Sequence, residues 1–249
     1  MEKNLEEIKL VRRIEKRFVK GIATYGLLED GDRILVGLSG GKDSLALLEL
    51  LARRAKIYKP RFSLVAAHVS MKNIAYESDL EYLRSFSENA GVPFVHCETS
   101  FDASTDKRKS PCFLCSWNRR KMLFTIAKEQ GCNKIALGHH MDDILETLLM
   151  NMIFQGAFST MPPRLVMRKF DMTIIRPMCL VHEADLESLA RLRNYRKQVK
   201  NCPYERDSHR AEMKNVLQTL EQMNPEARYS LWGSMGNIQR DLLPEENER

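Results

Sequence analysis

Residues 34–44 read Ile-Leu-Val-Gly-Leu-Ser-Gly-Gly-Lys-Asp-Ser, and they set the architecture that the sequence predicts. The apolar residues 34–38 are typical of a fully buried strand, and the apolar run 45–51 that follows favours a helix. Between them, Gly40 and Gly41 let the backbone turn sharply and bring its N–H groups close to a ligand. Those N–H groups and the positive end of the helix attract anions. The stretch therefore predicts a phosphate-binding loop.

The spacing of the glycines decides which kind of phosphate loop this is. A Walker loop needs a glycine five residues before its Gly-Lys pair and a Ser or Thr after it, but Val36 and Asp43 occupy those positions. The glycines at 37, 40 and 41 do not fit the G-x-G-x-x-G dinucleotide pattern either. An ordinary glycine turn before a helix is the alternative, but six defined residues in a strand–turn–helix setting are more specific than that.

The hexapeptide 39–44 resembles the SGGxDS loop of the PP-loop ATP pyrophosphatases. The resemblance implies an adenine nucleotide alpha hydrolase-like, Rossmann-like fold in which this loop binds the pyrophosphate of ATP. Cleavage then falls between the α and β phosphates, so the substrate becomes adenylated. The loop residues implied to bind ATP are Ser39, Gly40, Gly41, Lys42, Asp43 and Ser44.

The composition is that of an ordinary globular protein. The 249 residues are 43% hydrophobic and 29% charged, enough for one domain with an appendage. The net charge of +6 permits nucleic-acid binding without requiring it. We expect a cytoplasmic protein with no membrane association, because no apolar signal core or spanning segment is present. In that compartment the six cysteines are free, catalytic or metal-bound rather than disulfide-linked.

Strands and helices alternate along the chain. After the first strand we expect four more, in residues 62–69, 93–97, 133–139 and 173–177, with helices in 76–90, 119–129, 144–154 and 182–194. This alternation predicts an α/β fold with a parallel five-stranded sheet and helices on both faces. Helical additions at the two ends complete the prediction: an amphipathic N-terminal helix, and helices in residues 205–237 interrupted at Pro225.

Polar residues follow several of these strands. Ligands of parallel sheets bind at the carboxyl ends of the strands, so His139, Asp142 and Asp143 are expected to share one edge with the phosphate loop. Aspartates beside a triphosphate suit Mg²⁺, and Asp43 is a second candidate. The histidine can support phosphates or transfer protons. Helix capping is the simpler interpretation of the aspartates, but the Gly-His-His-x-Asp-Asp string 138–143 also resembles the second motif of the family.

Three cysteines are candidate metal ligands. Cys112 and Cys115 form a C-x-x-C pair, which fits a redox pair, half of a zinc site or half of an iron–sulfur site. Cys202 is the best third ligand, because it too lies in a loop after a basic stretch. Three thiolates hold a [4Fe-4S] cluster with one open iron, or a zinc ion with an open position. Three unlinked cysteines are the remaining alternative.

Several separate motifs together resemble one group of PP-loop enzymes, the tRNA 2-thiocytidine synthetases. They lie at 112–120, 134–147, 161–163, 175–177 and 201–203. The resemblance implies a [4Fe-4S] cluster on Cys112, Cys115 and Cys202. It also implies that ATP adenylates the C2 carbonyl of a cytidine, at position 32 of the tRNA anticodon loop, before sulfur replaces the oxygen. We accordingly expect an N-terminal helix in residues 1–30, the PP-loop domain with its iron–sulfur insertion in 31–200, and a helical extension in 201–249.

The remaining candidates concern adenine and RNA. The family resemblance implies that the backbone of His68 and Val69 lines the adenine pocket and that Gly138 belongs to the ATP site. Candidate RNA-binding residues are Arg119, Arg120, Arg176, Arg196 and Lys197. Expected partners are tRNA and a sulfur donor, either a cysteine desulfurase or inorganic sulfide, and a homodimer is compatible with the family. Two other functions are the alternatives: an amine ligase of the lysidine-synthetase kind, which needs no cysteines, and a non-catalytic nucleotide sensor, which need not keep Asp43 or the 142–143 aspartates.

Overall fold

The computed structural model describes residues 2–57, 59–72, 76–77, 79–101, 111–196, 199–200 and 209–244. The chain divides into two compact units, one of residues 1–141 with 162–207 and one of residues 142–161 with 208–249. The first unit contains the sheet and the second is helical.

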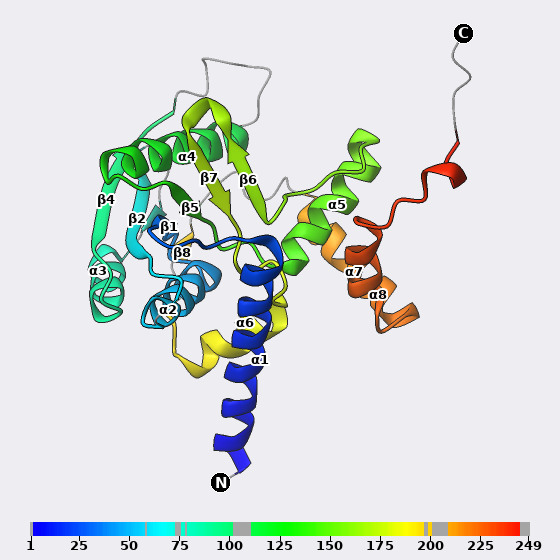
Figure 1. The fold of residues 1–249 in the computed structure, drawn as a ribbon, viewed down its shortest axis with the longest axis horizontal. Coiled ribbons are helices and arrows are strands. Elements are labelled where there is room, and N and C mark those ends of the chain that lie inside the picture. Colours follow the sequence, from blue (N-terminus) through cyan, green and yellow to red (C-terminus); the bar gives the residue numbers. More distant parts are fainter. Residues whose placement is uncertain are drawn as a thin grey trace. The chain divides into compact units, whose positions relative to one another are not determined.

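The first unit is built on a six-stranded sheet in the order β4-β2-β1-β5-β7-β6 (Figure 1). Five strands are parallel, which confirms the predicted α/β class: β1 Arg33–Gly37, β2 Ser63–Met71, β4 Phe94–Thr99, β5 Lys134–Ala136 and β7 Met172–Ile175. The register places Val36 beside Ala66 on one side and Ala136 on the other. The loop that follows β1 therefore leaves the middle of the sheet.

The sixth strand corrects the predicted count of five. Strand β6, Arg164–Met167, begins where the sequence indicated only a break, and it pairs antiparallel with β7. The short helix η1, Arg168–Phe170, and Asp171 at φ 47° turn the chain back between the two strands. Four residues at the edge of a sheet, alternately exposed and half-buried, carry too little apolar pattern to be recognised in the sequence.

Helices cover both faces of the sheet, as predicted. On one face lie α1 (Glu2–Tyr25), α2 (Lys42–Ala55) and α6 (Glu183–Leu192), which share a buried cluster with Ile34 and Val36. On the other face α4 (Pro111–Glu129) packs against Leu35 (Figure 1). The alternation of adjacent β1 residues between the two clusters explains why this strand is apolar throughout.

The helix predicted at 76–90 begins later than expected. Helix α3 is Leu80–Asn89, because the side chain of Asp79 caps it by accepting a hydrogen bond from the Tyr82 amide at 2.9 Å. The residues before the cap form β3, Tyr76–Glu77, which pairs antiparallel with β8, Val199–Lys200. The segment after β2 is thus hydrogen-bonded, through β3 and β8, to the segment after α6.

The N-terminal helix is fastened to the sheet domain by both packing and charge. Ile14 and Phe18 of α1 are fully or almost fully buried in the core. Arg13 and Arg17 both donate to Asp185 in the first turn of α6, at 2.7 and 2.6 Å. The basic face of α1 is therefore partly engaged inside the protein.

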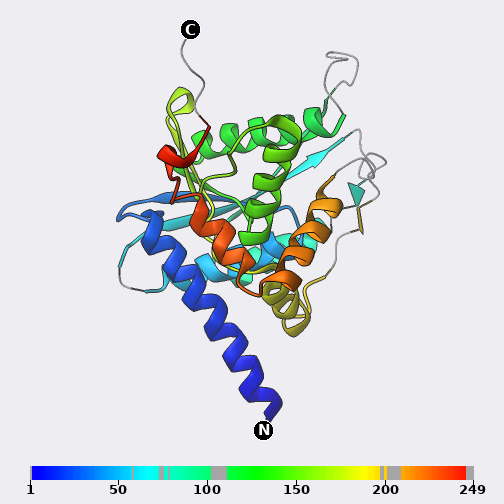
Figure 2. The same cartoon turned by 90° about the vertical axis from the view of Figure 1, so that its right-hand side faces the viewer.

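The second unit comprises most of α5 (Met141–Gln155) together with α7 (Arg210–Met223), α8 (Ala227–Ser234) and η3 (Arg240–Leu242). Figure 2 shows α7 and α8 as two helices joined by a short turn, which contains Pro225 as expected from the sequence. Among the residues that the structure covers, no helix is both long and apolar enough to span a membrane.

Candidate active site

The loop between β1 and α2 has the backbone shape of a phosphate cradle. Gly40 has φ 85°, a conformation that suits glycine, and Gly41 caps α2 without a side-chain hydrogen bond. Ser44 holds the loop closed, since its hydroxyl donates to the Gly41 carbonyl at 2.9 Å and accepts from the Gly40 amide at 3.1 Å. The loop thus keeps a fixed shape at the N-terminus of α2, the end of a helix that favours anions.

Lys42 lies between two carboxylates. Its ammonium group is 3.3 Å from Asp43 and 3.2 Å from Glu183. Burial lowers the pKa of Lys42, but the two carboxylates outweigh it and the net pKa is raised. The side chain is therefore a fixed cation at the loop. Sequence reasoning missed Glu183 as a site residue, because nothing in the sequence links it to a lysine 141 positions away.

The residues after β5 form the opposite wall of the site. A Cβ atom on Gly138 would lie 3.1 Å from the backbone carbon of Asp43 and 3.2 Å from the Ser44 nitrogen. Only a glycine allows this close approach of the two segments. His140 is 3% exposed, and its Nε2 lies 4.0 Å from Asp43 Oδ1. The geometry brings Gly138 and the phosphate loop together.

Asp142 and Asp143 belong to the second unit. Asp142 accepts from Arg228 at 2.9 Å and Asp143 from Arg210 at 3.2 Å. Both lie in the first turn of α5, where a negative charge interacts favourably with the helix dipole. Their predicted roles beside the triphosphate stay predictions.

Arg176 is a buried cation directly after β7. It is 6% exposed, and its guanidinium donates to the Pro162 carbonyl at 2.6 Å and to His139 Nδ1 at 3.3 Å. Burial, with a smaller contribution from Arg120, lowers its pKa to about 10. No carboxylate of the described ranges lies within ion-pair distance of it. A buried charge without a counter-ion is costly, so this position suits a ligand phosphate inside the site better than an RNA backbone crossing the surface.

The end of β2 is tied to the phosphate loop by His68. Its Nδ1 donates to the Leu38 carbonyl at 2.7 Å, and the ring is stacked at 5.9 Å on His96. Burial is the main cause that lowers the pKa of His68 to about 4, so the ring stays neutral near pH 7. Val69 is mostly buried and pairs with Cys97 of β4. The structure thus connects the predicted adenine-binding residues to the loop.

The predicted cluster ligands are described only in part. Cys112 lies in the first turn of α4, but its side chain, like all of Cys202 and Lys197, is outside the described residues. Cys115 is half-buried and not in a disulfide. Three-residue spacing places both helix cysteines on one side of α4. No group of three metal-binding side chains is found in the part of the chain with described side chains, but thiolates are the donors that iron–sulfur clusters use.

The other cysteines are packing residues. Cys179 is fully buried, and this burial raises its pKa to about 12. Burial also raises the pKa of Cys132 and of the half-buried Cys97. These three thiols therefore stay protonated near pH 7, which makes them poor metal ligands and poor nucleophiles.

Helix α4 follows β4, whose carboxyl end lies on the same edge of the parallel sheet as the phosphate loop. Arg119 contributes to the electrostatic surroundings of His68, and Arg120 to those of Arg176. Arg196, also predicted to bind RNA, is engaged locally by Asp79 at 3.3 Å and by the ring of Tyr82. Helix α4 therefore brings the C-x-x-C pair and the phosphate loop to the same end of the sheet.

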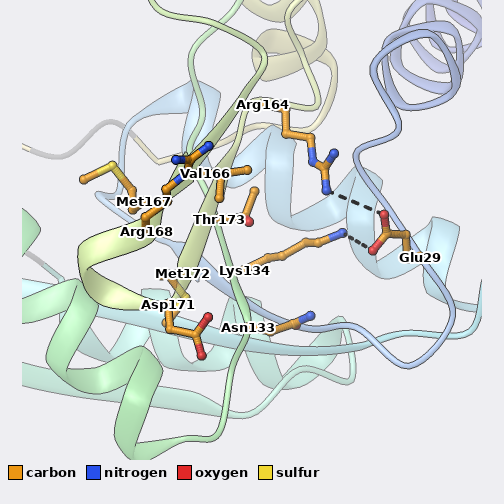
Figure 3. Close-up of a pocket in the computed structure, with 10 residues that line it drawn as sticks. All are labelled: Glu29, Asn133, Lys134, Arg164, Val166, Met167, Arg168, Asp171, Met172 and Thr173. Atoms are coloured by element: carbon orange, nitrogen blue, oxygen red, sulfur yellow. Dashed lines mark ion pairs between the residues drawn. The ribbon is translucent and has the colours of Figure 1, made fainter.

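A cavity of about 450 Å³ lies at the opposite, amino end of the strands (Figure 3). Lys134 is almost completely buried there and pairs with Asp32 at 2.8 Å and Glu29 at 3.5 Å. Arg164 also points toward Glu29 (Figure 3). Because ligands of parallel sheets bind at the carboxyl ends, this cavity is not the nucleotide site.

A parallel sheet with this loop at its carboxyl end defines a PP-loop nucleotide-binding protein, and a family model described as "PP-loop domain" matches residues 7–220. The tRNA-cytidine(32) 2-sulfurtransferase of Syntrophotalea carbinolica is 38% identical over 95% of this chain and 93% of its own. That of Geobacter sulfurreducens is 36% identical over 96% and 95%. The chain therefore belongs to the tRNA-cytidine(32) 2-sulfurtransferase family of PP-loop proteins, as the sequence motifs indicated.

A solved structure shares the fold. The U34-tRNA thiolase NcsA from Methanococcus maripaludis, determined with its [4Fe-4S] cluster, superposes with a TM-score of 0.75. It is 24% identical and the match covers 96% of this chain and 81% of NcsA. At this identity the likeness concerns the fold alone.

Proposed function

We propose that this protein is an ATP-dependent tRNA sulfurtransferase that converts a cytidine, at position 32 of the anticodon loop, to 2-thiocytidine. The observation that supports the proposal is that the C-x-x-C pair begins α4, which follows β4 of the parallel sheet. The 36–38% identity to named 2-sulfurtransferases supports the same substrate. An amine ligase or a nucleotide sensor would not need this cysteine pair.

The reaction has two balanced steps. The C2 oxygen of the cytidine attacks the α-phosphorus of ATP and pyrophosphate leaves. A sulfide then attacks C2, and AMP leaves with the former carbonyl oxygen. Adenylation is needed because a pyrimidine carbonyl oxygen is a poor leaving group. The site must therefore hold a triphosphate, an RNA base and a sulfur source together.

The phosphate loop and Lys42 bind the departing pyrophosphate in this proposal. The glycine loop and the positive N-terminus of α2 attract the phosphates, and the Lys42 cation adds its charge. Asp43 is the proposed Mg²⁺ ligand of the sheet domain, with Asp142 and Asp143 as further acidic candidates; Mg²⁺ bound there would neutralise phosphate charge. Gly138, His68 and Val69 complete the proposed ATP site.

His139 and Arg176 are proposed to stabilise the α-phosphate. Because Arg176 donates to His139 Nδ1, the neutral imidazole carries its proton on Nε2 and acts as a hydrogen-bond donor. The buried guanidinium supplies positive charge to the negatively charged oxygens of the α-phosphate. His139 is then an electrostatic group rather than the base of the reaction.

Cys112, Cys115 and Cys202 are the proposed ligands of a [4Fe-4S] cluster. The donor chemistry fits, since all three are thiols and Cys115 is half-buried on α4 and not in a disulfide. When bound, such a cluster supplies one iron without a protein ligand, at which a sulfide can be held. The proposed sulfur donor is a cysteine desulfurase or inorganic sulfide. The proposed compartment is the cytoplasm, where tRNA is found. The proposed oligomeric state is a homodimer.

The test combines metal analysis with nucleoside analysis. Protein purified and reconstituted without oxygen is expected to hold about four irons and four sulfides per chain, and to produce 2-thiocytidine in tRNA when given ATP and sulfide. Cys202→Ala should lose the cluster and the product, whereas Cys97→Ala, the matched control, should keep both. A zinc-containing or metal-free wild-type protein that still thiolates tRNA would contradict the cluster assignment, and absence of 2-thiocytidine from a loaded enzyme would contradict the substrate.

A further inference from the structure

One side of α4 carries two exposed aromatic residues. Phe113 and Trp117 are 43% and 49% exposed. Together with Lys121 they follow each other at four-residue intervals, which places them along one face of the helix. The buried residues Leu114, Ile126 and Ala127 lie elsewhere on the helix, where α4 packs on the sheet. Large exposed apolar side chains that gather on one face mark an interaction site.

Cations accompany these rings. The ammonium of Lys121 lies 5.5 Å from the centroid of the Trp117 ring, and Arg120 is exposed beside it. Phe170, from η1, is 52% exposed and stacks at 4.9 Å on Phe124 of α4. We call the surface formed by Phe113, Trp117, Arg120, Lys121 and Phe170 the α4 platform. It combines flat rings with positive charge.

We propose that the α4 platform binds unpaired nucleotides of the tRNA, with a base stacked on Trp117. This inference rests on the proposed function and names the surface by which the enzyme holds its substrate. Single-stranded bases stack on aromatic side chains in a sequence-tolerant way, and Arg120 and Lys121 can meet the phosphates between them. Residues 113–124 contain no Asp or Glu. Two such surfaces would repel each other, so RNA is favoured over a second copy of the chain.

The platform and Cys115 lie on different sides of α4. Trp117 is two residues beyond Cys115, which puts the two side chains on nearly opposite sides of α4. A helix with its side chains is about 10–12 Å across. A nucleotide stacked on Trp117 would therefore lie on the far side of the helix from Cys115, and the tRNA would be held there while the reacting nucleotide occupies the site. Trp117 is a substrate-positioning residue in this proposal.

The test uses the fluorescence of Trp117 itself. The chain has only two tryptophans, so Trp232→Phe leaves Trp117 as the single reporter. An anticodon stem-loop RNA added to this full-length, cluster-loaded protein is expected to quench the emission, because a stacked base quenches indole. Binding is measured separately from the anisotropy of a labelled stem-loop. Trp117→Ala should weaken binding roughly tenfold and Trp117→Phe should restore most of it. Lys121→Gln should reduce the slope of log binding constant against log salt concentration by about one, the loss of one phosphate contact.

Controls separate this inference from the proposed function. Tyr229→Ala, at a 46% exposed aromatic residue of α8, should leave affinity unchanged, and thermal unfolding should be the same for all variants. If the stem-loop binds and is thiolated without quenching Trp117, or binds Trp117→Ala equally well, the platform is wrong and the function stands. If Trp117→Ala changes sedimentation instead, the surface is a protein interface. If no tRNA binds or is thiolated, both proposals fail.

Discussion

The two ends of the sheet hold buried cations in different ways. At the amino end, Lys134 is surrounded by its own protein: Asp32, Glu29 and the Leu27 carbonyl, at 3.2 Å, accept from it. At the carboxyl end, the guanidinium of Arg176 donates hydrogen bonds to the Pro162 carbonyl and the His139 imidazole, among the described residues. The first arrangement is complete without a ligand, whereas the second gains from an anion. The contrast separates a structural cation from a binding one.

Lys134→Met should produce the largest loss of stability. It leaves the carboxylate of Asp32 buried without its cation, and breaking a buried pair costs about 3–5 kcal/mol. Urea unfolding measures the free energy of unfolding, and the folded fraction should still release pyrophosphate from ATP. Arg164→Ala is the matched control, since its ion pair with Glu29 is exposed and long, at 3.7 Å. A Lys134→Met protein as stable as wild type would show that the amino-end network is dispensable.

Arg176→Met should show the reverse pattern. Removing a buried charge that has no carboxylate partner leaves no orphaned anion, so stability is expected to stay within about 1 kcal/mol. The rate of tRNA-dependent pyrophosphate release should fall about 10²–10³-fold, as for loss of a transition-state donor. Arg176→Lys should recover part of this rate. If Arg176→Met turned over at the normal rate, Arg176 would be a structural cation like Lys134 rather than a ligand-binding one.

His68 extends the comparison to a group that is buried neutral. Its pKa of about 4 lies below the ordinary value of 6.5, so the unfolded chain binds a proton between these values and the folded protein does not. Stability should therefore fall as the pH drops from about 6.5 to 4, by up to roughly 3 kcal/mol. His68→Asn should flatten this dependence in urea titrations at successive pH values. An unchanged slope would mean that other groups control acid unfolding.

The sequence was sufficient for features that depend on local patterns. The sequence predicted the strand–loop–helix around Ser39-Gly40-Gly41, the parallel sheet and the family motifs. It could do so because apolar periodicity and glycine spacing depend only on residues that are close together in the sequence. The pairing of Lys42 with Glu183, the burial of Arg176 and strand β6 were not. Each depends on a contact between distant segments or on an edge position, where local pattern carries little information.

The edges of the sheet bear on how the protein behaves when concentrated. Strands β4 and β6 are the outermost strands of the six-stranded sheet, so each pairs with a neighbouring strand on one side only within that sheet. β6 has only four residues, begins with an exposed arginine and runs into Arg168 and Lys169. At the far edge Glu98 of β4 pairs with Lys72 at 3.4 Å. Short, charged edges resist strand-to-strand joining between molecules, so this enzyme is built to stay dispersed at high concentration.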